Sequence, residues 1–285
     1  MAQWQILTRL LPLYLLSLPL QAEISAERGE YLLNAGGCIA CHTGDEGEEL
    51  AGGYKIESPF GTFYSPNITP DEETGIGNWS DDDFVNAFQK GTSPAGEHYY
   101  PAFPYTSYTG MNRDDLLSLK AYLDTVPPVT AASREHELVW YASWRTALAG
   151  WKWLYFNEAR FEPDSEQTDS WNRGAYLVRH LGHCGECHTP RNFFGGTDSA
   201  QELAGAPGFG DAKKAPNLTP HEDGLKAWRR SAWELFLEIG MLPNGDFAGG
   251  SMSPVIDENT SLLSSADRAA MIEYLRSLEA LPNPD

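Results

Sequence analysis

The sequence predicts a mostly α-helical protein of two tandem domains of one kind, each consisting of helices and long loops wrapped around a buried cofactor. Three observations support this prediction. The two halves carry similar motifs in the same order, helical spacing of apolar residues opens and closes each half, and long Gly- and Pro-rich loops lie between these helices. Loops of that length are unusual in a compact domain unless they wrap something.

Length and composition agree with two globular domains. The chain has 285 residues, of which 41% are hydrophobic and 12% aromatic, so it can form cores and is not disordered. Its formal net charge of −20 repels nucleic acids and anionic membrane surfaces, so no nucleic-acid partner is expected. Most of the acidic residues are interpreted as keeping the protein in solution.

Residues 1–22 are predicted to be a signal peptide. Arg9 supplies a positive charge, the apolar run "LLPLYLLSLPL" follows, and Ala22 offers a small residue for cleavage. The alternative is an uncleaved N-terminal anchor. No later stretch approaches the ~20 apolar residues of a membrane span, so we expect no transmembrane anchor in the mature chain.

The first domain is predicted to span residues 23–127. Its opening and closing helices are indicated by apolar residues at spacings of three and four, and a run of acids suits the positive end of a third helix. Residues 51–78 are expected to be a long loop. The residues that carry these predictions are Tyr31, Leu32 and Ala35, then Leu116, Leu119 and Leu123, and the acids Asp81, Asp82 and Asp83.

Residues 128–165 are predicted to be an aromatic-rich linker, and residues 166–285 the second domain. In the linker, "LVWYASWRTALAGWKWLYF" is interpreted as a helix with an apolar face, the alternative being a helix packed across both domains. The second domain repeats the helical spacing of the first, and Ser264 with Asp267 predicts the start of its closing helix. Its helical stripes are Tyr176, Leu177 and His180, and Met271, Leu275 and Leu278.

Four sites match the glycosylation pattern N-x-[ST], at Asn67, Asn78, Asn217 and Asn259. Asn67 and Asn217 occupy the same repeat position, in "PNIT" and "PNLT". Because asparagine side chains can bond the backbone two residues on, this recurrence favours a structural turn over a glycan.

All four cysteines lie in two C-x-x-C-H units, "CIACH" and "CGECH". This unit is the attachment signature of covalent haem c, in which two thiols bond the vinyl groups and the adjacent imidazole binds the iron. One haem is therefore predicted to use Cys38, Cys41 and His42, and the other Cys184, Cys187 and His188. A pair of disulfides, a zinc site or a redox pair are the alternatives, but none of them explains a histidine after each pair.

Methionine is the usual second axial ligand of electron-transfer haem and raises its potential. Met111, just before the closing helix of the first domain, is the predicted ligand of the first iron. A helix-start core residue is the alternative interpretation, with His98 and then His136 as replacement ligands.

For the second iron we predict Met252, which lies in the small-residue loop "AGGSMSPV", with Met241 as the runner-up. Met271 is expected in the helix core. His180, His183 and His221 are interpreted as packing or surface residues, although a hydrogen bond from His183 near the haem edge is open. Arg191 is interpreted either as a partner of a haem propionate or as a solvent-exposed side chain.

The chain resembles the cytochrome c subunits of bacterial periplasmic flavin-dependent or quinoprotein alcohol, gluconate and fructose dehydrogenases. The resemblance covers nearly all of residues 25–282 and rests on "NRGAYLVRHLGHCGECHTPRN", "SPNITPDEETGIGNWS", "YYPAFPYTSYTGM" and "GWKWLYF". It implies class I cytochrome c domains with His/Met iron, two covalent haem c groups and a periplasmic location. Many such subunits have three haem domains and a membrane contact, whereas this sequence has two C-x-x-C-H units.

These features predict an electron carrier and not an enzyme in its own right. The expected partners are a periplasmic dehydrogenase, which donates electrons, and a downstream cytochrome or oxidase. The alternative is a dihaem enzyme such as a peroxidase, which would need one haem with an open or displaceable position. The sequence offers no set of residues for acid–base or nucleophilic catalysis.

Overall fold

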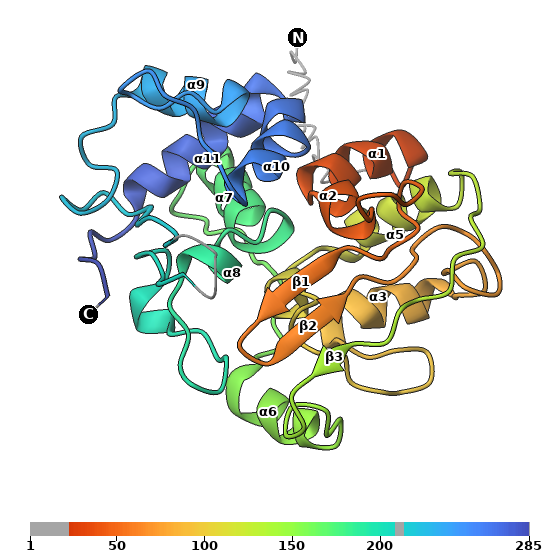
Figure 1. Cartoon of the computed structure of the whole chain (residues 1–285). Coiled ribbons are helices and arrows are strands. Elements are labelled where there is room, and N and C mark those ends of the chain that lie inside the picture. Colours follow the sequence, from red (N-terminus) through yellow and green to blue (C-terminus); the bar gives the residue numbers. More distant parts are fainter. Residues whose placement is uncertain (1–22, 209–213, 285) are drawn as a thin grey trace, which may run out of the picture.

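The computed structural model describes residues 23–208 and 214–284. Two helical halves lie side by side, and one continuous apolar core includes residues of both (Figure 1). This confirms the predicted mostly helical fold. The predicted signal peptide, residues 1–22, lies outside the described residues, and the predicted domain boundaries stay a prediction. Among the residues described, none of the helices combines the length and apolar character that a membrane crossing requires.

Both outer helices predicted in the first half are present, and they pack on each other. The helices of this half are α1 (Ala26–Ala35), α2 (Cys38–His42), α3 (Asp81–Lys90), α4 (Tyr105–Tyr108) and α5 (Arg113–Leu123). The acids at 81–83 begin α3 as expected. There Ser80 and Asp83 form a reciprocal capping box, in which each side chain bonds the other's backbone N–H.

The loop expected at residues 51–78 is interrupted by a hairpin that the sequence did not predict. Strand β1 (Lys55–Ser58) pairs antiparallel with β2 (Gly61–Tyr64), and β2 pairs with β3 (Glu137–Leu138) of the predicted linker. Gly61 has φ 114°, and a Cβ there would overlap the carbonyl oxygen of Glu137. A glycine at this position therefore permits the close approach of β3.

The linker forms one helix, α6 (Ala147–Tyr155), at the edge of the molecule (Figure 1). Only Leu148 of this helix is buried, and the Trp153 side chain is 84% exposed. Polar atoms of α6 reach both halves. The Lys152 ammonium donates to the carbonyls of residues 90 and 91, and Trp151 Nε1 donates to the Phe194 carbonyl at 2.9 Å. The helix thus has a largely exposed apolar surface and also bridges the halves.

The second half repeats the plan of the first. Its α7 packs on α11, as α1 packs on α5, and Ser264 caps α11 by accepting the Asp267 N–H, as predicted. Its elements are α7 (Asp169–Tyr176), the π-helical turn η1 (Leu177–Leu181), α8 (Gly185–His188), η2 (Ser199–Gln201), α9 (Arg230–Ile239), α10 (Met252–Asp257), η3 (Thr260–Leu262) and α11 (Ser265–Ser277).

One glycine in each half lets the paired helices approach closely. A Cβ on Gly29 of α1 would overlap the Ser118 carbonyl of α5, and a Cβ on Gly174 of α7 would overlap the Ala270 carbonyl of α11. These two glycines belong to the repeated "RGEY" and "RGAY" segments. The repeat therefore encodes the helix crossing itself.

We predict that Gly29→Ala lowers the free energy of unfolding by about 3 kcal/mol, because the added methyl group forces two packed helices apart. Gly150→Ala is the matched control, since nothing lies within 4 Å of its new Cβ in exposed α6. That change should stabilise by about 0.5–1 kcal/mol through helix propensity. Guanidinium unfolding checks both, and equal effects of the two variants would contradict the close crossing.

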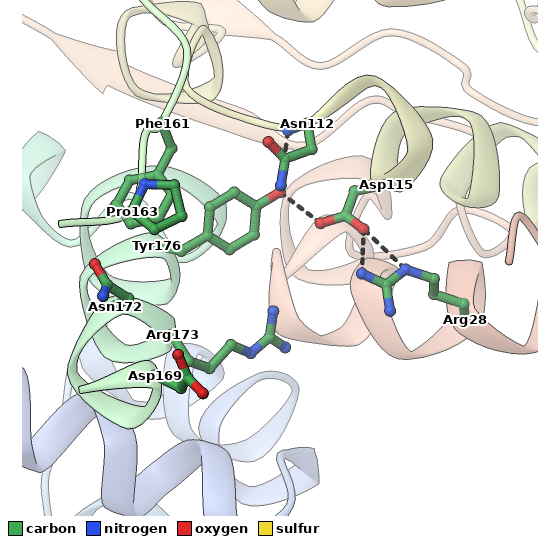
Figure 2. A pocket seen from close by; sticks show the side chains of 9 residues that line it. All are labelled: Arg28, Asn112, Asp115, Phe161, Pro163, Asp169, Asn172, Arg173 and Tyr176. Atoms are coloured by element: carbon green, nitrogen blue, oxygen red, sulfur yellow. Dashed lines mark hydrogen bonds and ion pairs between the residues drawn. The ribbon is translucent and has the colours of Figure 1, made fainter. Parts of the chain in front are cut away.

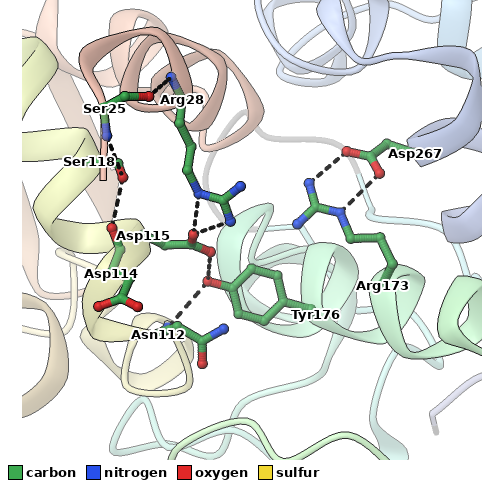
Figure 3. A network of polar contacts seen from close by, with 9 residues as sticks. All are labelled: Ser25, Arg28, Asn112, Asp114, Asp115, Ser118, Arg173, Tyr176 and Asp267. Carbon is green, nitrogen blue, oxygen red and sulfur yellow. Dashed lines mark hydrogen bonds and ion pairs between the residues drawn. The ribbon is translucent and has the colours of Figure 1, made fainter. Parts of the chain in front are cut away.

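We call the contact between the pair α1 and α5 and the pair α7 and α11 the seam. Tyr176 OH crosses it to donate to Asp115 Oδ2 at 2.6 Å, and Tyr31 OH crosses in the opposite direction to donate to Asp267 Oδ2 at 2.7 Å. Each aspartate is also paired with the arginine of its own half. These pairs, drawn in Figure 3, are Arg28 with Asp115 and Arg173 with Asp267.

A hollow of about 270 Å³ opens on the seam, with Arg28, Asp115, Arg173 and Tyr176 among the residues that line it (Figure 2). Asp115 accepts hydrogen bonds from Arg28 and Tyr176, and Asp267 accepts a hydrogen bond from Arg173. We therefore interpret the hollow as the solvent-facing side of the seam contacts.

Candidate functional site

The two C-x-x-C-H units form single helical turns, α2 and α8, at matching places in the two halves. Their four cysteines are free, with Cys41 and Cys187 exposed and Cys38 and Cys184 half-buried. Burial, followed by the charge of the neighbouring cysteine, raises the pKa of the Cys38 and Cys184 thiols to about 12. Both units therefore present a pair of protonated thiols, with one thiol of each pair open to a bound group.

Each predicted iron ligand is oriented by a backbone carbonyl. His42 Nδ1 lies 2.8 Å from the Pro66 oxygen, and His188 Nδ1 lies 2.7 Å from the Pro216 oxygen. A carbonyl can only accept, so Nδ1 carries the proton and Nε2 keeps its lone pair. Burial lowers the pKa of both histidines, although these hydrogen bonds oppose the shift. The neutral ring with a fixed tautomer is the form that binds a metal.

The prolines that supply these carbonyls begin the repeated "PNIT" and "PNLT" segments. Asn67 Oδ1 accepts the Thr69 N–H at 2.9 Å, and Asn217 Oδ1 accepts the Thr219 N–H at 2.8 Å, which confirms the predicted turn role. The same segments also hold the chain that follows each closing helix. The Asn67 and Asn217 amides donate to the carbonyls of Val129 and Leu281.

The donor set fits covalently bound haem c. Each unit presents two thiols and an oriented imidazole within one helical turn, and this arrangement recurs in both halves. When bound, haem c supplies reversible one-electron chemistry at its iron.

The predicted methionine ligands lie in different surroundings. The Met111 side chain is fully buried between α4 and α5, in the same core as Leu32 and Tyr108. Met252 is the first residue of α10 and is partly exposed. Met271 is buried in α11, as expected. The assignments of Met111 and Met252 to the irons stay predictions.

The alternative histidines have protein partners of their own. His136 Nδ1 accepts the Tyr64 N–H at 3.2 Å, and its ring packs edge-on against Phe63. His98 Nδ1 lies 3.2 Å from Lys152 Nζ. Both histidines thus belong to the hairpin and linker region.

The Arg191 side chain is 20% exposed, so the solvent-exposed interpretation is wrong, while its pairing with a haem propionate stays a prediction. Its guanidinium pairs with Glu186, one of the two residues between the cysteines of the second unit, and also donates to the Gly195 carbonyl. Glu186 accepts two further hydrogen bonds of 2.7 Å, from Thr106 and Ser107 of α4. Burial raises the pKa of Glu186, but Arg191 and the two hydroxyls outweigh this effect, so its pKa is lowered. Arg191 thus favours the ionised form of the Glu186 carboxylate. This carboxylate connects the second unit to α4 of the first half.

The two units lie close to each other. Burial, then the charges of Cys187 and Glu258 from the second half, raises the pKa of the Cys41 thiol of the first half. The turns at Gly36 and Gly182, which precede the two units, also approach each other. A Cβ added to Gly36 would lie 3.4 Å from the Leu181 side chain, which directly precedes Gly182. Sequence reasoning predicted each unit separately and had no signal for this proximity.

Known proteins match both halves of the chain. Residues 26–127 match the family model "Cytochrome c". A "Diheme cytochrome c-type" protein of Cereibacter sphaeroides is 42% identical over 266 residues, covering 90% of this chain and 86% of its own length.

Two longer relatives are subunits of dehydrogenases. The "Fructose dehydrogenase cytochrome subunit" of Gluconobacter japonicus is 41% identical over 90% of this chain, and the "Gluconate 2-dehydrogenase cytochrome c subunit" of Pantoea cypripedii is 39% identical over 89%. The chain spans 53% and 59% of those two proteins, respectively.

Proposed function

The chain belongs to the dihaem c-type cytochrome family, and from that premise we propose that it carries electrons from a periplasmic dehydrogenase to downstream respiratory acceptors. One observation carries the proposal. Two thiol pairs, each followed by a carbonyl-oriented imidazole, lie close together in one compact chain. Two neighbouring one-electron sites can accept electrons at one haem and release them at the other.

The site residues of the proposal are those of the two units. Cys38 and Cys41 would hold the first haem, with His42 and Met111 as its axial ligands. Cys184, Cys187, His188 and Met252 would hold the second haem in the same way. With both irons six-coordinate, neither would offer an open position to peroxide or oxygen.

The relatives support the proposed kind of partner. Two of them are cytochrome subunits of a fructose and a gluconate dehydrogenase, which supports a dehydrogenase as the donor. The flavin-dependent or quinoprotein class of that donor is what the family resemblance implies. A donor and acceptor outside the cytoplasm require export, which residues 1–22 would direct. The downstream acceptor is proposed to be another cytochrome or an oxidase.

We predict that the oxidised protein shows a near-infrared sulfur-to-iron band equivalent to two methionine ligands. Met111→Ala and Met252→Ala should each remove half of this band, because each replaces one thioether by a group that cannot bind iron. Met241→Ala is the control and should leave the band unchanged. Loss of half of the band in Met241→Ala would move the second ligand to that residue.

The function itself is tested by the spin state and the peroxide reaction of the full chain. Two low-spin irons and no peroxide turnover are expected of an electron carrier. High-spin iron at one site, together with peroxide turnover, would contradict the proposal and support a dihaem peroxidase.

A further inference from the structure

His183 has an unusual backbone conformation for its residue type. Its φ of 39° is left-handed, and the equivalent residue before the first C-x-x-C-H unit is Gly37, with φ 63°. Glycine adopts this region freely, whereas other residues cost about 1–2 kcal/mol. At this position the second half therefore carries a strained residue where the first half carries an unstrained one.

The other left-handed residues confirm that this difference is specific. Apart from His183, the described residues contain two non-glycines with positive φ, Leu50 and Leu203, each at 61°. These two leucines are equivalent in the repeat, and each donates its N–H to the equivalent threonine, Thr43 or Thr189. Their conformation belongs to the shared fold, whereas that of His183 does not. Strain of this kind persists where the surroundings hold it, and it gathers at functional sites.

The His183 side chain contacts the first half through its ring. The ring packs edge-on against the Tyr108 ring, with centroids 5.4 Å apart and planes at 84°. A glycine at residue 183 would remove this contact.

This contact joins the surroundings of the two predicted haem sites. His183 directly precedes Cys184 of the second site. Tyr108 is buried in the apolar cluster against which Cys38 of the first site also packs. The contact between His183 and Tyr108 therefore connects the second unit to the apolar surroundings of the first.

We infer that His183 is a positioning residue that couples the two haem sites and maintains a short, packed route for electron transfer between them. This inference rests on the proposed function, and it names the contact through which the electron would pass. In that step one electron would pass from the ferrous haem iron held by one unit to the ferric haem iron held by the other, so one iron would be oxidised and the other reduced. His183 itself gains or loses neither an electron nor a proton.

The deciding variant is His183→Gly, which gives the second half the residue of the first. Because the change relieves strain, the midpoint of thermal unfolding should stay the same or rise, and both haems should remain attached. After rapid reduction by a pulse-generated radical, the rate of electron equilibration between the haems should fall several-fold. The two midpoint potentials, measured by redox titration, should stay near those of the unchanged protein, which separates coupling from driving force.

Two further variants test the route. His183→Asn tolerates the left-handed backbone but cannot make the ring contact, so it should also slow equilibration. Tyr108→Leu, alone and combined with His183→Gly, should show that the two effects are not additive. If the glycine variant fails to incorporate haem, the asparagine variant decides.

An unchanged equilibration rate in a fully loaded His183 variant would overturn the inference. A slower rate explained entirely by shifted potentials would also overturn it. Both outcomes are distinguishable from failure of the proposed function, because the measurement needs no dehydrogenase and no acceptor.

Discussion

Removing both thiols of the second unit, by Cys184→Ser with Cys187→Ser, is expected to halve the haem that remains covalently bound to the chain. Serine cannot form the thioether bonds, and the imidazole of His188 alone holds a haem only by coordination. Pyridine haemochrome absorbance per mole of protein and the mass of the denatured chain both measure the loss. Transfer between two haems then becomes impossible in the variant.

The matched control is Cys38→Ser with Cys41→Ser in the first unit. It should also halve the covalent haem, and the four-serine chain should carry none. Full haem content in either double variant would contradict the assignment of that unit. Loss of both haems from one double variant would show that attachment at one site requires the other.

Replacing Asp115 by alanine is expected to lower the free energy of unfolding by about 3 kcal/mol, because it leaves a buried tyrosine hydroxyl and an arginine without their partner. The Asp115 side chain is nearly fully buried, while Arg28 is about one-third exposed and regains some hydration. The expected loss therefore lies at the low end for a broken buried ion pair. Tyr176→Phe removes the bond to Asp115 and the longer bond of 3.3 Å from the Asn112 N–H, and should cost about 1.5 kcal/mol.

The neighbouring Asp114 provides the control. It lies in the same helical turn and is not buried, so Asp114→Ala should change stability by less than about 0.5 kcal/mol. Guanidinium unfolding followed by tryptophan fluorescence compares the three variants. The same stability for Asp115→Ala and Asp114→Ala would show that the seam bonds contribute nothing net.

The helices and their caps were predictable because their signals are local. The spacing at Leu116, Leu119 and Leu123 and the start signal at Ser264 both describe helices in the structure. The hairpin at residues 55–64 was missed because each strand has four residues, too few for an alternating pattern to outweigh the surrounding glycines and prolines.

The units were also predictable, since cysteine spacing is a property of the sequence alone. The Pro66 and Pro216 carbonyls were missed because a backbone acceptor leaves no trace in residue type. The repeat of "PNIT" and "PNLT" was the one signal, and it predicted the turn. It did not predict that the proline carbonyls of the same segments orient the two histidines. The bonds of Tyr31 and Tyr176 across the seam depend on how the halves meet, which a repeated motif does not reveal.

The seam has the form of an isologous interface between two subunits joined into one chain. Tyr31 meets Asp267 and Tyr176 meets Asp115, the reciprocity that a two-fold axis imposes on a homodimer. In a true homodimer every substitution appears at both sites, so the two haems would remain equivalent. A single chain removes this constraint, as Gly37 and His183 show. The covalent fusion thus keeps the geometry of a symmetric pair while allowing its two members to differ in sequence and in backbone conformation.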